Sequence, residues 1–258
     1  MIRFCLLLFL AMLLLARPAL AMPLPDCAGV VEAAHAKIVR IEKDGALLLN
    51  DGRTVVLEGI RLPGIDRPAD PISAKALETL RGLATKNPLT LTSTAPKQDR
   101  YGRLRVQAFA DVWLQVELLK RGLARVSTMP DRQECSPDFY DAEIEARNAG
   151  RGLWALPGFA VQKAEDFQAP EGSFQIVEGH VFTVANPPSG RAFLDFDPDF
   201  RKGFSAVIAP EDHKAFRNID PALADLAGHD VRIRGTVLNF NGRPEIALFN
   251  PRQIELIK

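Results

Sequence analysis

Two arginines and a tyrosine surround one glycine in the segment from Gln98 to Leu104, which reads QDRYGRL. Apolar and polar residues alternate on both sides, in LTLTST before it and LRVQAFA after it, so the pattern predicts a turn between two half-buried strands. Arginine binds phosphate through a planar fork of donors, and an aromatic ring can stack on a base. Arg100 and Arg103 are therefore candidate phosphate-binding residues, and Tyr101 is a candidate stacking residue. A solvated surface turn is the other interpretation of this local pattern.

The composition is that of a globular protein without a strong electric field. The chain has 258 residues, of which 47% are hydrophobic and 25% are charged, which is enough apolar mass for one large or two small domains. The 32 basic residues balance 32 acidic residues. Strong non-specific binding to DNA needs a positive field, so any nucleic-acid site here must be a local patch.

The first 21 residues have the pattern of a secretory signal peptide. Arg3 supplies a positive start, CLLLFLAMLLLA an apolar stretch, and Ala19-Leu20-Ala21 a small-x-small cleavage site. The apolar stretch is about a dozen residues long, whereas a spanning helix needs about 20. We therefore expect export to the periplasm or the medium, with cleavage after Ala21 and no stable membrane span. Cleavage would remove two basic residues and no acidic one, which leaves a small negative charge.

Export changes the interpretation of the cysteines. Cys5 would leave with the signal peptide, whereas Cys27 and Cys135 would remain. Two cysteines in an oxidising compartment suggest one disulfide, which by loop entropy would contribute up to about 4.7 kcal/mol. Two unpaired buried thiols are the alternative. The four histidines are scattered and no CxxC pair is present, so no zinc site is expected.

The first half of the mature chain alternates between strand-like and helical stretches. The segment AKIVRIEKDGALLLNDGRTVVLEGI predicts strands divided by turns, and the Asp51-Gly52 pair is a strong hairpin signal. After a proline-rich loop, Asp70 is a plausible N-cap with Pro71 at the first position of a helix that runs to about Ala84.

Strands flank the DRYGR segment, and VWLQVELLKRGLARV then predicts a short helix followed by a strand. Ser136-Pro137 is expected to cap a further helix that ends near Gly150–Gly152. This order of short strands with inserted helices fits a small Greek-key barrel of the oligonucleotide-binding (OB) type.

The second half also predicts a β-rich unit. Strand-like stretches such as SFQIVEGHVFTV, FSAVIA and DVRIRGTVLNF recur, with short helical insertions before the fourth strand. The predicted fold class is therefore mainly β with inserted helices, in two successive OB-like barrels. The expected boundaries are a signal peptide at 1–21, a first domain at 22–158, a linker at 159–172 and a second domain at 173–258.

The first domain resembles the staphylococcal nuclease (thermonuclease) family. The resemblance rests on LLLNDGRTVVLEGI, DRYGR, VELLKRGLARV and EARNAGRGLW, which together span about Ile38 to Trp154. It implies an OB-fold domain and the hydrolysis of phosphodiester bonds in nucleic acids. The C-terminal unit lies outside the family's domain.

The family's chemistry uses two arginines, a glutamate as candidate base, and a calcium ion held mainly by two aspartates. The resemblance matches Arg103 to one of the arginines, and Tyr101 to a ring that packs beside the bound nucleotide. The family carries its remaining functional residues in one short stretch, of the form arginine, leucine, x, glycine, isoleucine-aspartate, x, proline-glutamate. This stretch contains the other arginine, one calcium aspartate and the glutamate. Two alignments of that stretch compete.

In the first alignment, VVLEGIRLPG is the equivalent segment. Val56 then stands at the arginine, Arg61 at the aspartate and Gly64 at the glutamate. Hairpin geometry favours this alignment because the strand after Gly52 must return in pairing with LLL, and TVVLEGI does so at once.

In the second alignment, IRLPGIDRPAD is the equivalent segment. Arg61 then matches the arginine and Asp66 the calcium aspartate, while Ala69 stands at the glutamate with Asp70 one residue late. This alignment recovers two functional residues, but it places Arg61 nine residues after Gly52, which requires a bulge or a longer strand.

Both alignments lose the glutamate and the other calcium aspartate, which should stand at Gly45, with Asp44 one residue early. Missing carboxylates weaken a calcium site steeply, and loss of a positioned base typically costs ~10²–10⁴ in rate. We therefore expect an exported thermonuclease-like protein with a degenerate nuclease site. It would act as a binding module for single-stranded nucleic acid or for an envelope protein.

Two alternatives remain at this stage. One is an active phosphodiesterase in which Arg61 and Arg103 clamp the phosphate, Asp66 holds Ca²⁺ and Asp70 is the base. The other is a protein-binding scaffold of the cell envelope that never meets nucleic acid. The sequence gives no indication of the oligomeric state.

Overall fold

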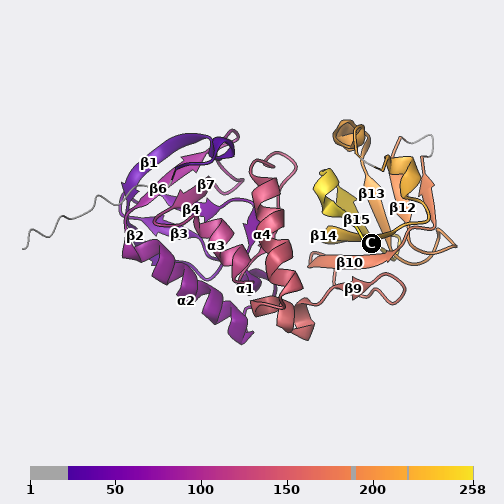
Figure 1. The fold of residues 1–258 in the computed structure, drawn as a ribbon, viewed down its shortest axis with the longest axis horizontal. Coiled ribbons are helices and arrows are strands. Elements are labelled where there is room, and N and C mark those ends of the chain that lie inside the picture. The colour runs from indigo at the N-terminus through magenta and orange to yellow at the C-terminus, as the bar shows by residue number, and fades with distance from the viewer. Residues whose placement is uncertain (1–22, 187–189, 220, 258) are drawn as a thin grey trace, which may run out of the picture.

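Two β-barrels stand side by side in the computed structural model, which describes residues 23–186, 190–219 and 221–257 (Figure 1). Each barrel encloses its own cluster of buried apolar side chains. The predicted signal peptide at 1–21 lies outside the described residues. Within the described residues, no helix has the length and apolar character required to cross a membrane.

The first barrel is a six-stranded sheet with the order β1-β6-β7-β4-β3-β2. Its strands are β1 (Val30–Ala36), β2 (Ile38–Ile41), β3 (Leu47–Leu49), β4 (Thr54–Leu57), β6 (Leu89–Ser93) and β7 (Leu104–Phe109). Only Lys37 separates β1 from β2, so one bent segment forms both ends of the sheet and the sheet curls on itself. β4 and β7 are parallel, and the other neighbours are antiparallel. This is an OB-type Greek-key path, as the sequence predicts.

Four helices and a small sheet surround this barrel. The helices are α1 (Pro63–Asp66), α2 (Pro71–Lys86), α3 (Leu114–Lys120) and α4 (Ser136–Asn148), and the small sheet pairs β5 (Ile60–Arg61) with β8 (Arg125–Val126). Helix α2 begins as predicted, because the Asp70 carboxylate accepts the Ile72 N–H at 3.1 Å. The predicted cap of α4 is wrong. Ser136 is already helical, and the residue before the helix is Cys135, in a left-handed conformation with φ 59°.

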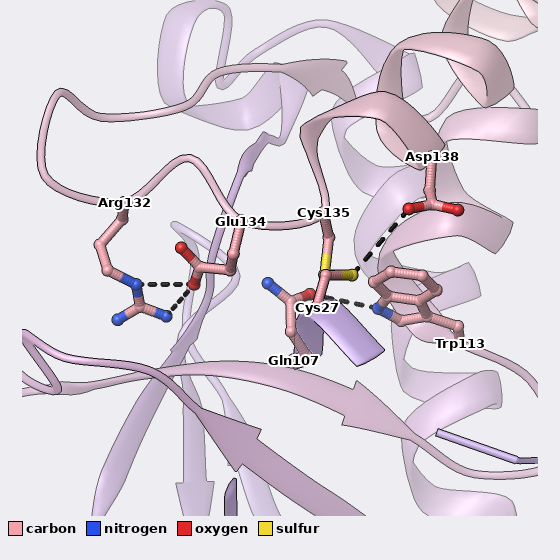
Figure 2. Close-up of a disulfide and its surroundings, with 7 residues drawn as sticks. All are labelled: Cys27, Gln107, Trp113, Arg132, Glu134, Cys135 and Asp138. Carbon is pink, nitrogen blue, oxygen red and sulfur yellow. Dashed lines mark hydrogen bonds and ion pairs between the residues drawn. A yellow bond between two sulfur atoms is a disulfide. The ribbon is translucent and has the colours of Figure 1, made fainter. Parts of the chain in front are cut away.

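The predicted disulfide between Cys27 and Cys135 is confirmed. It ties the 3₁₀-helix η1 (Asp26–Ala28), which precedes β1, to the start of α4 (Figure 2). On one side the Cys27 sulfur lies 3.9 Å from the Asp138 carboxylate, and on the other the indole of Trp113 donates to Gln107 at 3.2 Å. The bond thereby fixes the end of the loop 127–135, which runs from β8 to α4.

The second barrel repeats the path of the first. Its strands are β10 (Phe174–His180), β11 (Thr183–Ala185), β12 (Ala192–Asp195), β13 (Ser205–Ile208), β14 (Asp230–Phe240) and β15 (Arg243–Leu248). The order is β11-β12-β13-β15-β14-β10, with β10 and β11 as one bent segment and with β13 and β15 parallel. The 3₁₀-helices η4 (Pro210–Phe216) and η5 (Leu223–Leu226) precede β14, β16 (Ile254–Leu256) pairs with β14, and β9 (Gln162–Lys163), inside the predicted linker, pairs with β10.

A buried ion pair joins the two barrels. Arg234 of β14 donates to Glu143 of α4, and their side chains are 5% and 0% exposed. The second carboxylate oxygen of Glu143 accepts the Val126 N–H at 2.5 Å, and the Arg234 guanidinium lies 4.7 Å from the centre of the Tyr140 ring. Helix α4 is the element of the first domain that lies beside the second barrel (Figure 1). Because a buried charge cannot lose its partner cheaply, this pair fixes how the barrels meet.

We predict that Arg234→Met lowers the free energy of unfolding by about 3–5 kcal/mol, because it leaves the Glu143 carboxylate buried without a counter-charge. The double variant Arg234→Met/Glu143→Gln should recover most of this loss, since the amide still accepts the Val126 N–H. Urea unfolding followed by circular dichroism measures both. The control Arg232→Met breaks the part-exposed pairs with Glu178 and Glu255 and should cost about 1 kcal/mol or less. Equal midpoints for Arg234→Met and the control would contradict the prediction.

Candidate functional site

A pocket of about 200 Å³ opens beside Arg103 on the first barrel. The turn after β2, strand β4, the start of α1 and the loop 127–135 enclose it. Its lining includes Asp44, Gly45, Val56, Leu62, Ile65, Arg103, Ser127 and Met129. The wall is mainly apolar, and Arg103 and Asp44 bring opposite charges to it.

The DRYGR segment forms the expected turn because Asp99 organises it. The Asp99 carbonyl accepts the Gly102 N–H at 3.0 Å, and one carboxylate oxygen accepts the N–H groups of Tyr101 and Arg103 at 2.9 and 3.0 Å. Gly102 has φ 74°, a left-handed conformation that favours glycine. The turn therefore requires this spacing of aspartate, glycine and arginine. The turn also places Arg103 at the mouth of the pocket.

Arg103 is bound by two carboxylates. Its Nε donates to Asp99 and one terminal nitrogen to Asp44, both at 2.8 Å, and its side chain is 28% exposed. Burial opposes ionisation of Asp99, but the hydrogen bonds from Arg103 and the backbone outweigh it and lower the pKa of this carboxyl. Both acids beside the arginine are therefore paired with it, and the two carboxylates outnumber the one positive charge.

Val56 faces the same pocket as Arg103. The turn at Asp51-Gly52 returns β4 directly onto β3, with Val55 opposite Leu47, and β4 then pairs in parallel with β7, with Val55 opposite Leu104. This is the placement that the first alignment predicts. It puts a valine where that alignment places the family's arginine.

Of the other candidate residues, Asp66 and Asp70 lie away from this pocket. Arg61 of β5 donates to both oxygens of Asp66 at 2.8–3.0 Å, and Arg125 donates to the same carboxylate at 2.7 Å. Asp70 is used as the cap of α2. Asp66 and Asp70 line a separate cavity of about 610 Å³ between the barrels, together with Phe174. Arg61 lines the Arg103 pocket, so only one of the three second-alignment residues reaches it.

The residues around Arg103 do not fit a calcium ion. Calcium takes six to eight oxygen ligands, with carboxylates prominent among them. Here Asp44 and Asp99 are held by the arginine, and the first alignment puts Gly45, Arg61 and Gly64 at the family's carboxylate positions. Among residues 23–186, 190–219 and 221–257, no three Asp, Glu, His or Cys side chains form a metal-binding cluster.

A buried charge network beneath the pocket was not foreseen from the sequence. Arg105 of β7 pairs with Glu58 at 2.7 Å and with Asp131 at 2.8 Å, and the Arg105 and Glu58 side chains are less than a tenth exposed. Burial opposes the charge of Arg105, but the two carboxylates raise its pKa. The only signal was an arginine inside the apolar strand LRVQAF. The network holds the loop 127–135 over the barrel.

A second surface lies on the outer side of the DRYGR turn. Tyr101 is 66% exposed, and the guanidinium carbons of Arg100 and Arg103 lie 4.8 and 5.3 Å from the centre of its ring. The depression beside it is about 720 Å³ and includes Arg53 and Lys97 in its lining. The ring is thus open to solvent on a local cluster of basic residues. We call this the Tyr101 surface.

The fold and these two sites define an OB-barrel protein with an arginine at the mouth of a pocket and an open tyrosine ring beside it. Residues 54–156 match the family model described as staphylococcal nuclease homologue. The match falls within the first domain and is to the family that its sequence resembles, and the second barrel lies outside the match. A search of curated proteins found no similar protein.

We predict that Arg103→Met lowers the free energy of unfolding at pH 7 by about 1–2 kcal/mol, discounted because Asp44 is half exposed. Since the folded-state pKa of Asp99 is lowered, its contribution is complete above the unfolded carboxylate pKa of about 3.9 and is lost as pH falls through the folded value. The difference from wild type should therefore shrink below about pH 4. Urea unfolding at several pH values measures it.

Arg40→Met is the matched control because Arg40 pairs with Glu42 in solvent, at 65% exposure. It should change stability little at any pH. An Arg103→Met protein as stable as wild type at pH 7 would contradict the role assigned to this ion pair.

Proposed function

We propose that this is an exported thermonuclease-like protein that binds its ligand without hydrolysing it. The observation that carries the proposal is the state of Arg103, whose Nε and one terminal nitrogen donate to Asp99 and Asp44 in a pocket that Val56 also lines. Phosphoryl chemistry needs positive charge directed at the phosphate, and an arginine paired with two carboxylates supplies little of it.

The missing base supports the same proposal. A general base must lie within hydrogen-bond reach of the attacking water, and its loss typically costs ~10²–10⁴ in rate. Asp66 accepts from two guanidinium groups and Asp70 caps a helix, and both line another cavity. An active phosphodiesterase built on Arg61, Asp66 and Asp70 would need these groups to leave their partners and reach Arg103.

Single-stranded nucleic acid is the ligand that best fits the Tyr101 surface. An open aromatic ring flanked by a guanidinium suits a base and its phosphate, and stacking tolerates any base. Arg100 makes no ion pair with a described residue, so its charge is available to a ligand. In this arrangement Tyr101 stacks on the base and Arg100 binds the phosphate.

An envelope protein is the second candidate ligand, and one observation favours it. The other cations of the Tyr101 surface are already paired, Arg53 with Asp51 and Lys97 with Glu32, both at 2.7 Å. A surface of balanced charge with an exposed ring suits a mixed protein interface as well as a polyanion. Affinity for single-stranded DNA, and its dependence on salt, separates the two.

We predict no cleavage when the mature chain, residues 22–258, is incubated with denatured DNA or RNA in calcium. Staphylococcal nuclease is the positive control, and a chelator is the negative control. Gel electrophoresis of the substrate measures the outcome. Calcium-dependent cleavage that Arg103→Ala abolishes would show that the site is active and would overturn the proposal.

We predict that Tyr101→Ala weakens binding of a labelled oligothymidylate about fivefold to a hundredfold, which is the range for loss of one stacking ring. Tyr101→Phe keeps the ring and should bind like wild type. Arg100→Ala should weaken binding and reduce the slope of log affinity against log salt by about one. Fluorescence anisotropy measures all three. Equal affinities for Tyr101→Ala and Tyr101→Phe would exclude this site.

A further inference from the structure

One face of the second barrel combines acidic, basic and aromatic side chains. Strand pairing places Asp195, Ser205 and Glu245 directly opposite one another across β12, β13 and β15. Their neighbours Leu194, Ala206 and Ile246 point into the core and are fully buried, so the three polar residues lie on the outer side of the sheet. On the same side, Phe193 precedes Asp195 by two residues, and Phe240 lies opposite Arg243. We call this the outer face.

Aromatic rings and arginines cover the outer face. Phe200 is 61% exposed and Phe240 is 44% exposed. The Arg191 guanidinium lies 5.1 Å from the ring centre of Phe193 and 5.5 Å from that of Phe240. Arg201 lies 5.6 Å from the ring centre of Phe200, and Arg243 donates to the backbone carbonyl of Phe200. Exposed rings beside guanidinium groups therefore extend from β12 to the turn after β14.

The charges of this face are arranged by depth. Its cations Arg201 and Lys202 are 76% and 74% exposed. Its acids lie lower, all of them buried or half-buried: Asp195, Asp197, Asp199 and Glu245. Asp199 already binds both exposed cations, at 3.0 and 3.3 Å. A ligand that approaches from solvent therefore meets the side chains of Arg201 and Lys202 first, with the carboxylates beneath them.

We propose that the outer face binds single-stranded nucleic acid. Phe200 and Phe240 stack on bases, and Arg191 and Arg201 bind phosphates. A neutral oligosaccharide would use the rings, but it would gain little from the guanidinium charges beside them. The polyanion is therefore the better fit. The proposed function assigns single-stranded nucleic acid to the first domain, and this inference assigns the same class of ligand to the second barrel. It therefore rests on the proposed function.

The outer face continues toward the Arg103 pocket. Leu238 lies opposite Glu245 on β14, and Leu238 also lines a pocket of about 280 Å³ between the barrels. Ser127 and Met129 of the loop 127–135 line both this pocket and the Arg103 pocket. Met129 and Leu238 are 52% and 43% exposed, so apolar surface is open along this path. One strand of nucleic acid could thus contact both barrels.

The test uses the mature chain and a fluorescein-labelled oligothymidylate of about 20 nucleotides, which exceeds the about 4–16 that one OB fold covers. Phe240→Ala and Phe200→Ala should each weaken binding about fivefold or more. Phe182→Ala is the matched control, because Phe182 is 45% exposed on the same barrel but packs edge-on against His180 and not against an arginine. Urea midpoints confirm that the variants remain folded.

Each outcome separates this site from the Tyr101 surface. Loss of affinity in Phe240→Ala but not in Tyr101→Ala supports the outer face and removes the first-domain site. The reverse result overturns the outer face and leaves the proposed function standing. Wild-type protein that binds no oligothymidylate overturns both. Binding of chitohexaose that Phe240→Ala abolishes would assign the outer face to saccharides and also overturn the inference.

Discussion

The shared ion pair of Arg103 with Asp99 and Asp44 is the interaction on which the first domain's site depends. It ties the turn before β7 to the turn after β2, two segments 59 residues apart that close the pocket from opposite sides. In a nuclease, an arginine at this place must keep donors free for phosphate, so its carboxylate neighbours must serve a metal instead. Here both carboxylates pair with the arginine itself. The arrangement stabilises the pocket's shape, and it is the basis of the proposal that the site binds without hydrolysis.

Sequence patterns correctly predicted the structural elements that depend only on neighbouring residues. The Asp70-Pro71 start of α2 and the Asp51-Gly52 hairpin each depend on a few neighbouring residues, so their patterns were sufficient. The disulfide followed from having two cysteines in an expected oxidising compartment. The Arg234–Glu143 pair could not be foreseen, because its partners are 91 residues apart and belong to different barrels. A charged residue in a predicted strand does not show which distant residue it pairs with. For the same reason, the ion pairs of Arg105 could not be predicted.

The two barrels have the same strand order although their sequences differ. Both follow the order of one bent strand, two antiparallel strands, a parallel return and a closing strand, although no sequence repeat relates the halves. Alternation of buried and exposed residues and turns at suitable places are enough to specify such a barrel. The outer surfaces are free to differ. Helices lie around the first barrel, whereas the second leaves strands and aromatic rings open.

The loop 127–135 connects these surfaces, because it is held from three sides. Asp131 pairs with buried Arg105 of the first barrel, the disulfide fixes Cys135, and the Gln133 amide donates to the Phe249 carbonyl of the second barrel at 3.4 Å. Between these anchors, Met129 lines both the Arg103 pocket and the pocket between the barrels. A reducing compartment would release one of the three anchors and loosen the wall that both pockets share. The bond persists where thiols are oxidised, which is the environment that the proposed export would provide.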